Sequence, residues 1–179
     1  LNVYIEIFRG TPMIVQSMVI FYGSAQAFNI SLDRTWAAIF IVSINTGAYM
    51  SEIVRGGILA VDPGQFEAAT ALGMTHGQTM RKVVLPQVVR NILPATGNEF
   101  VINIKDTSVL NVISVVELYF TGNTVATQNY QYFPTFTIIA VIYFVLTFTI
   151  TRILRYIERR LDSDTYTTGA NQMQVKEVK

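Results

Sequence analysis

Long apolar stretches alternate with short polar ones along this chain. Four apolar stretches are longer than the roughly 20 residues that an α-helix needs to cross a membrane, and they cover residues 3–27, 32–60, 83–105 and 133–157. No charged residue lies between Arg9 and Asp33. The mixed stretch 107–129 favours a short helix with a loop over a further span. The pattern predicts an all-α integral membrane protein, with residues 1–161 as its membrane domain and a polar loop at 61–82.

The polar loop predicts two short helices with a bend between them. Asp62 suits an N-cap, Pro63 the first helical position and Gln65 the third, which is a capping-box pattern. Gly73 can end this helix, because glycine adopts the left-handed conformation at little cost. Residues 75–78, Thr-His-Gly-Gln, repeat the capping signal and start a second helix. Two capped helices at a polar bend are typical of an element that docks another protein.

Composition supports a membrane protein and excludes several kinds of site. Apolar residues make up 51% of the chain and charged residues only 14%, against about 25% charged in soluble domains. The net charge of +1 with scattered basic residues indicates no nucleic-acid surface. Without cysteine there is no disulfide or thiol chemistry. His76 lacks a metal-ligand partner at a useful spacing, and no glycine-rich phosphate loop is present, so we expect no metal site and no ATP hydrolysis by this chain.

Basic residues orient the predicted spans, because cytoplasmic loops are enriched in Lys and Arg. They flank the polar loop and follow the last span: Arg81, Lys82, Arg90, Arg152, Arg155, Arg159 and Arg160. Both regions are therefore predicted to be cytoplasmic, and the turn at 29–34 to lie outside. The chain begins with Leu1 inside an apparent element, so we expect a missing N-terminal segment. Residues 162–179 form a polar tail without apolar periodicity, which we predict to be disordered.

The polar loop also carries a resemblance. The pattern Glu-Ala-Ala, a glycine, an aliphatic residue and Leu-Pro at fixed spacing resembles the EAA loop of the membrane permease subunits of bacterial ABC importers. It is met by Glu67, Ala68, Ala69, Gly73, Val83, Leu85 and Pro86, with Val83 where the family usually has Ile. The resemblance implies a type I importer permease fold and assigns coupling to an ATPase subunit to Glu67, Ala68, Ala69, Gly73, Leu85 and Pro86.

Three further segments resemble the polar amino-acid group of these permeases. They are the FRGTP run at 8–12 with Gln16, the YxxEIxRGG run at 49–57, and the NIKDTS run at 103–108, where Val109 replaces the usual Leu. Members of this group typically have five spans with the N-terminus outside. The resemblance therefore implies that one N-terminal span is missing here and that residue 1 lies on the cytoplasmic side.

Ionisable residues inside spans are functional candidates, because a charge at the bilayer centre is costly. Glu99, Asn103 and Asp106 would share one helical face, next to Lys105. In relatives an amino acid is held about halfway across the membrane, and the positions of Asp106 and Glu99 recognise a cationic side chain. The full set of predicted pathway residues is Glu99, Asp106, Asn103, Thr107, Ser108, Glu52, Thr11 and Gln16. Two structural alternatives stay open: Glu99 paired with Lys105 or Arg90, and Glu52 paired with Arg55.

The sequence therefore favours a permease subunit of an ATP-driven importer for polar amino acids, with a leaning toward basic ones, in the bacterial inner membrane. The implied partners are an ABC ATPase subunit dimer, a second permease subunit, identical or not, and an extracytoplasmic solute-binding protein. ATP and Mg²⁺ would be used by the ATPase, and this chain would hold no cofactor. The alternatives are a secondary amino-acid carrier and an intramembrane enzyme with Glu99 and Asp106 as an acid pair.

Overall fold

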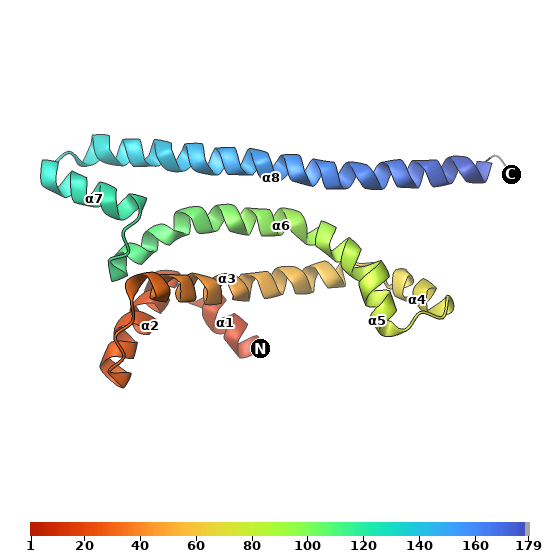
Figure 1. Cartoon of the computed structure of the whole chain (residues 1–179), viewed down its shortest axis with the longest axis horizontal. Helices are drawn as coiled ribbons and strands as arrows, with labels where there is room; N and C mark the ends of the chain where they lie inside the picture. Colours follow the sequence, from red (N-terminus) through yellow and green to blue (C-terminus); the bar gives the residue numbers. More distant parts are fainter. Residues whose placement is uncertain (178–179) are drawn as a thin grey trace. The chain divides into compact units, whose positions relative to one another are not determined.

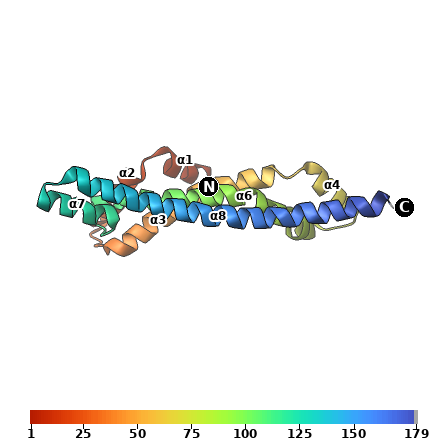
Figure 2. The ribbon, with the colours of Figure 1, turned by 90° about the horizontal axis from the view of Figure 1, so that it is seen from above.

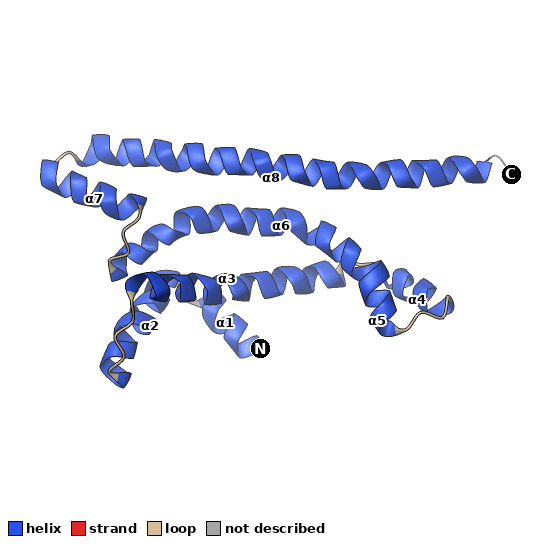
Figure 3. Ribbon diagram, in the orientation of Figure 1, coloured by secondary structure: helices blue, strands red, loops and turns tan. Residues whose placement is uncertain are grey.

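The computed structural model describes the backbone of residues 1–177 and the side chains of residues 1–160, and every regular element in that part is helical (Figures 1 and 3). In chain order the elements are α1 (Asn2–Gly10), α2 (Met13–Phe28), α3 (Arg34–Leu59), α4 (Pro63–Ala71), α5 (His76–Thr79), the π-helical turn η1 (Met80–Val84), α6 (Leu85–Asp106), the 3₁₀-helix η2 (Thr107–Ile113), α7 (Leu118–Asn129) and α8 (Tyr132–Glu177). The all-α prediction is confirmed.

The helices form two compact units. The first comprises residues 1–52 and 99–148, and the second residues 53–98 and 149–179. The long helices α3, α6 and α8 each contribute to both, so the chain passes repeatedly from one unit to the other.

In the first unit, α2 and the start of α3 pack on η2. The buried core residues are Ala37, Ala38, Ile41, Leu110 and Ile113, with Met13, Ile20 and Phe21 among the side chains packed around them. Residues 37, 38 and 41 share one face of α3, as the helical period of 3.6 requires. Alanine at two of these positions lets the neighbouring backbone come close. Tyr22 on α2 adds a hydrogen bond to the Val112 carbonyl at 3.1 Å.

Also in the first unit, α7 lies alongside the first turns of α8 (Figures 1 and 2). The rings of Tyr119 and Phe136 are 5.7 Å apart, and Phe136 also stacks on Tyr132 at 6.5 Å. Aromatic contacts at these distances add to the energy of burial. The Tyr119 contact attaches α7 to α8. The stretch 107–129 forms two helical segments, η2 and α7, with a loop between them, where the sequence predicts one short helix and a loop, and its predicted place outside the spans stays a prediction.

The second unit is centred on Val61, Val84 and Val88, with Ile58, Phe66, Met80 and Ile92 packed against them. This cluster joins the end of α3, the polar loop at 61–82 and the start of α6. The polar loop is called the docking loop from here on. Gly57 is required at the contact, because a Cβ there would lie 2.2 Å from a methyl group of Ile92. The loop that the sequence predicts to dock a partner is thus supported by a small apolar core of its own.

Among the residues that the structure describes, two helices are long and apolar enough to cross a membrane, α3 and the part of α8 from Tyr132 to Arg160. A third span results if the helix from His76 to Ile113 is taken together with α7, to which it is bent by 56°. Large apolar side chains on α8 such as Ile138, Phe144 and Val145 are exposed. Such exposure is unfavourable in water and suits contact with lipid.

The predicted first span of 3–27 is wrong as a single helix. It breaks at Thr11, which is extended with φ −121° and ψ 145°, and Pro12, which precedes the first residue of α2. Proline disfavours the helical conformation of the residue before it and offers no N–H to continue the helix. The apolar helix that remains, α2, has 16 residues.

The other predicted spans fall on α3, α6 and α8. Their predicted ends differ most for α8, which continues to Glu177 instead of ending near residue 157. Most of the predicted tail therefore lies within the bounds of this helix. Side chains beyond Arg160 lie outside the described residues, and the predicted disorder of 162–179 stays a prediction.

Candidate functional site

The polar loop folds as two short helices with a bend, as predicted. Asp62 caps α4 by accepting a hydrogen bond from the Gly64 N–H at 2.7 Å, with Pro63 as the first helical residue. Gly73 ends the helix with φ 74°, and nothing lies within 4 Å of the place where its Cβ would be. The left-handed backbone alone therefore selects glycine at this position.

The second capping box is confirmed, and the first is not. Thr75 and Gln78 exchange hydrogen bonds at 2.9 and 3.4 Å, which fixes the start of α5. At α4 the Asp62 half is present, but the Gln65 Oε1 accepts from the Gln87 side chain at 3.4 Å. That contact ties the first helix of the loop to the start of α6, a tertiary interaction that competes with the local cap.

The predicted coupling residues divide into exposed and buried ones. Glu67 and Ala68 are exposed on α4, and Leu72 just after it is 81% exposed. Ala69 is buried, so it shapes the loop and does not offer a surface to a partner. Leu85 and Pro86 are exposed at the start of α6. The exposed face of α4 has low relief and one carboxylate, which suits docking to another protein.

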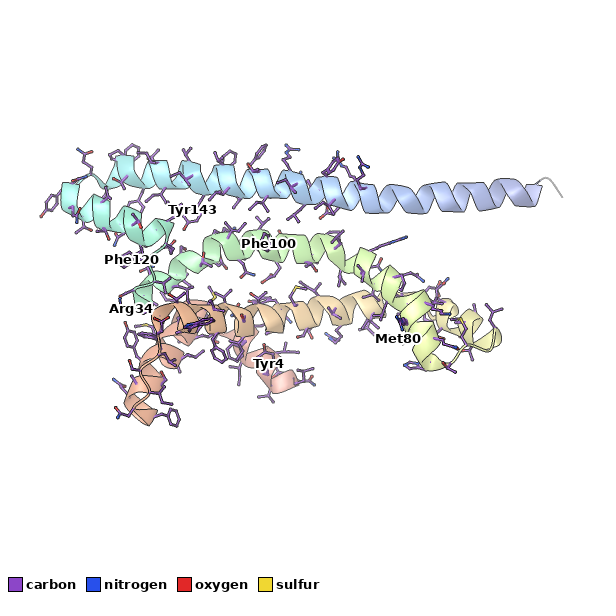
Figure 4. The ribbon with its side chains drawn as sticks, in the orientation of Figure 1. Tyr4, Arg34, Met80, Phe100, Phe120 and Tyr143 are labelled. Carbon is purple, nitrogen blue, oxygen red and sulfur yellow. The ribbon has the colours of Figure 1, made fainter. Side chains whose placement is uncertain are left out.

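Between the loop and α6 the backbone widens into the π-helical turn η1. The N–H of Leu85 bonds the carbonyl of Met80, five residues back, and Met80 marks the turn in Figure 4. Pro86 is compatible with this widening, since its ring would clash with the carbonyl of Lys82 in a regular helix and it has no N–H for that carbonyl, although Pro94 is accommodated inside α6 without a π turn. Sequence reasoning missed this turn, although a proline near the start of a helix that continues from another was its signal.

The predicted polar stripe of α6 lies on one continuous helix. Glu99, Asn103 and Asp106 are spaced four and three residues apart, so they share a face. Asn103 is engaged across the helix pair: its amide donates to the Thr46 hydroxyl at 3.0 Å, and that hydroxyl lies 3.2 Å from the Asn103 carbonyl oxygen. Asn103 therefore links α6 to α3. The sequence analysis did not single out Thr46, although a hydroxyl inside an apolar span was a signal for it.

The stripe continues into η2. Thr107 donates to the Ile104 carbonyl at 3.0 Å, and the Ser108 carbonyl accepts from Asn111 at 2.7 Å. Both predicted pathway residues thus take part in the tight turn that ends α6. Asp106, the last residue of α6, is exposed.

A pocket of about 360 Å³ lies in the first unit between α3 and η2. Its lining comprises Thr35, Ala38, Ile39, Val42, Ser43, Thr107, Leu110, Val115 and Glu117. Apolar side chains make most of the wall, and three hydroxyls and one carboxylate supply its polar groups. Of the predicted pathway residues, the pocket brings in Thr107.

Thr11 and Gln16 lie together at the break between α1 and α2. The Gln16 amide nitrogen is within 3.0 Å of the carbonyls of Phe8 and Thr11 and of the Thr11 hydroxyl, and its oxygen accepts from Asn45 on α3 at 3.0 Å. Gln16 and Asn45 are both buried. A buried amide that meets the free carbonyls of a helix end is a structural brace, and the predicted place of both residues on the substrate pathway stays untested.

Glu52 pairs with Arg9 of α1 at 3.3 Å, and the Arg9 guanidinium also lies 5.5 Å from the centre of the Tyr49 ring. Earlier on α1, Tyr4, which is labelled in Figure 4, donates a hydrogen bond to the Ile44 carbonyl. Together these contacts attach α1 to α3. The sequence did not indicate Arg9 as a partner of Glu52, because only the fold brings the two together, and the predicted alternative of Glu52 with Arg55 stays a prediction.

Glu117 joins α7 to α8 and was not predicted. Its carboxylate accepts from the N–H groups of Tyr119 and Phe120 at 2.9 and 2.6 Å, as the N-cap of α7. It also accepts from the Tyr143 hydroxyl at 2.9 Å, and Figure 4 labels Tyr143 on α8 and Phe120 on α7. A carboxylate at a helix N-terminus is favoured by the helix dipole.

Comparison with known proteins extends these observations. Residues 1–163 match the family of the "binding-protein-dependent transport system inner membrane component". The glutamine transport system permease protein GlnP of Escherichia coli (strain K12) is 41% identical over 160 residues, which cover 89% of this chain and 73% of GlnP. The arginine transport system permease protein ArtQ of Bacillus subtilis (strain 168) is 38% identical over 161 residues, 90% and 74% of the two chains.

A solved structure, "Crystal structure of an amino acid ABC transporter with histidines", is also similar. It shares 45% sequence identity with this chain and superposes with a TM-score of 0.84, covering 89% of this chain and 74% of that one. The helical arrangement described above is therefore that of an ABC transporter membrane subunit.

Proposed function

Since this chain belongs to the family of inner membrane components of binding-protein-dependent transport systems, we propose that it works as the permease subunit of an ATP-driven importer for polar amino acids. The observation that carries the coupling part of this proposal is the docking loop. Its two capped helices, with left-handed Gly73 between them, pack on the buried cluster of Val61, Val84 and Val88 and leave one face of α4 exposed.

The partners follow from that loop. An ATPase subunit dimer would bind the exposed α4 face, hydrolyse ATP with Mg²⁺ and drive the transport cycle, while this chain carries no cofactor. A solute-binding protein would deliver substrate on the outer side, and a second permease subunit, identical or related, would complete the pathway. In this orientation the docking loop and the C-terminus are cytoplasmic, in line with the arginines that follow the last span.

The substrate would cross along the α6 stripe. Two carboxylates, Glu99 and Asp106, stand seven residues apart on one face, and an uncompensated carboxylate inside a membrane is costly. A cationic amino acid supplies the missing charge when it binds. Movement of the docking loop would be transmitted through η1 to α6, which carries the stripe, and would change the side to which the stripe opens.

Reconstitution tests this function. The permease, its ATPase and the binding protein are placed in proteoliposomes, and uptake of radiolabelled arginine, lysine, histidine and glutamine is followed with ATP, without ATP, and with an ATPase variant that binds but does not hydrolyse ATP. We expect uptake only with hydrolysable ATP. Uptake that follows an ion gradient and ignores ATP would identify a secondary carrier, and chemical conversion of the amino acid without transport would identify an enzyme.

A further inference from the structure

The hydrogen bonds between Thr46 on α3 and Asn103 on α6 lie in the middle of the proposed pathway. We infer that Thr46 is a positioning residue, which acts through Asn103 to set where the acidic face of α6 lies against α3. This inference rests on the proposed transport function, because it assigns the residue a role in substrate selection. Asn103 itself then serves the substrate indirectly, with its amide bound to α3.

The hydrogen-bonded pair of Thr46 and Asn103, called the bridge from here on, lies between the two carboxylates along α6. Asn103 is four residues after Glu99 and three before Asp106 on one helix, so all three side chains lie on the same face. A rotation of α6 about its axis moves both carboxylates together. Asn103 lies between the two carboxylates on α6, and its hydrogen bonds to Thr46 fix that rotation.

The pocket gives the second argument. Ser43 and Thr107 line it from opposite sides. Thr46 lies one helical turn after Ser43, and Asn103 lies one turn before Thr107. The bridge therefore joins the same two stretches of helix, one turn away from the pocket. Leu110 and Ala38 continue the antiparallel register in the other direction, as members of the buried core. The wall of the pocket and the two carboxylates therefore depend on one alignment of α3 with α6.

Hydrogen bonding is what makes this alignment specific. Apolar contacts between helices are weakly directional, and lipid tails compete with them equally well. The Asn103 side chain both donates to and lies within bonding distance of the Thr46 hydroxyl, so two hydrogen-bonding groups of one amide are satisfied by one partner. Other rotations of α6 would separate the Asn103 amide from Thr46, and a polar group that loses a partner without replacement costs free energy.

Transport measurements separate positioning from a general stabilising role. We compare Thr46→Val, which removes the bridge, with Thr46→Ser, which keeps the hydroxyl, and with the double variant Thr46→Val and Asn103→Leu, which makes both partners apolar. Thr137→Val on α8 is the control, because the Thr137 hydroxyl bonds the Phe133 carbonyl of its own helix at 2.7 Å and, among the side chains that the structure describes, no other helix. Uptake of arginine and of glutamine is measured per assembled complex.

We expect Thr46→Val to change the ratio of KM values for arginine and glutamine by about threefold, the size of one interhelical hydrogen bond, with little change in the amount of complex. Thr46→Ser and Thr137→Val should keep the wild-type ratio. The double variant should assemble normally, since replacing both partners is nearly neutral for stability, and should keep the altered ratio. Equal loss for both substrates, or a normal ratio in the double variant, would show that the bridge is structural only.

A distance measurement tests the inference without transport. The chain has no cysteine, so spin labels can be attached to cysteines introduced at Phe40 and Phe100, both exposed residues of the first unit. Thr46→Val should shift or broaden the distance distribution between α3 and α6, and Thr46→Ser should not. An unchanged distribution in Thr46→Val would overturn the inference even if the ratio of KM values is altered. A shifted distribution in Thr46→Val, together with no ATP-driven uptake by the wild-type complex, would instead refute the proposed function and leave the structural part of the inference standing.

Discussion

The Tyr143 hydroxyl donates a hydrogen bond to Glu117 at 2.9 Å, and this contact connects α8 to the N-terminus of α7. Because Glu117 also caps α7, one carboxylate holds three donors from two helices. The contact therefore holds the start of α7 against α8, and the loss of this contact is the basis of the first prediction.

Tyr143→Phe should lower the free energy of unfolding by about 1 kcal/mol, the usual net value of one hydrogen bond. Glu117→Ala should cost about 2 kcal/mol, because it removes the cap as well as the partner of Tyr143. Thermal unfolding in detergent, followed by circular dichroism, measures both. The double variant should cost less than the sum, since the two changes remove the same bond. Tyr132→Phe, at an exposed tyrosine of the same helix, is the control. Additive losses in the double variant would show that Glu117 and Tyr143 do not stabilise the protein through a shared hydrogen bond.

Gly73→Ala should destabilise the docking loop by about 1 kcal/mol and reduce coupling of ATP hydrolysis to uptake, because a Cβ is disfavoured in the left-handed conformation. The surrounding space is open, so the backbone is the whole cause. Gly77→Ala is a matched control, with equally open space and no positive φ. The ratio of ATP hydrolysed to amino acid transported is the measurement. An equal ratio in Gly73→Ala and Gly77→Ala would show that coupling does not depend on the left-handed conformation at Gly73.

Glu67→Lys should weaken binding of the ATPase subunit. The change puts a cation near the N-terminal half of α4, whose N-terminus already carries positive partial charge. Co-purification of the two subunits from detergent gives the readout, and Glu67→Gln should have a smaller effect. Glu6→Lys changes the net charge equally at another exposed site. If the Glu67→Lys variant co-purifies with the ATPase subunit as well as the wild type does, Glu67 is not part of the surface that binds this subunit.

Glu99→Gln should reduce uptake of arginine, lysine and histidine more than uptake of glutamine, with a shift in preference on the order of tenfold, near 1.4 kcal/mol. The cause is loss of a carboxylate that a cationic substrate neutralises. Competition among radiolabelled amino acids in proteoliposomes measures it, with Glu6→Gln on α1 as the control. If all substrates lose equally, Glu99 is structural and the preference for basic substrates should be abandoned.

Pro86→Ala should convert η1 toward a regular α-helix, because the clash with the Lys82 carbonyl and the missing N–H would both be gone. A π turn holds one more residue than an α turn, so the conversion turns the docking loop relative to the start of α6. We expect normal assembly with lower transport per ATP. Pro94→Ala is the control, since Pro94 lies inside α6. Normal coupling in Pro86→Ala would show that the widened turn is without function.

Local signals allowed much of this molecule to be predicted from sequence. The caps at Asp62 and Thr75 and the left-handed Gly73 depend on residues within a few positions of one another, and all three are present in the structure. The family resemblance is confirmed for the same reason, because its motifs are short and fixed in spacing. The break at Pro12 was also readable locally, but the apolar character of residues 3–27 masked it.

What the sequence did not reveal depends on the fold. Thr46 meets Asn103 across 57 positions, Glu117 meets Tyr143 across 26, and Arg9 reaches Glu52 from another helix. None of these pairs has a spacing that marks it, since the partners are brought together by helix packing. Gln65 shows the same effect in reverse, because a tertiary partner displaced the local cap that the pattern predicts.

The break at Thr11 and Pro12 leaves α2 with 16 residues, a length of about 24 Å at 1.5 Å per residue. The hydrocarbon core of a typical bilayer is about 30 Å thick, so this helix is too short to match it. A short apolar helix is accommodated when the bilayer thins around it or when flanking side chains reach the interface. If α2 lies in the bilayer, its length makes it sensitive to hydrophobic mismatch, and we expect the acyl-chain length of the surrounding lipid to load the Gln16–Asn45 hydrogen bond that joins α2 to α3.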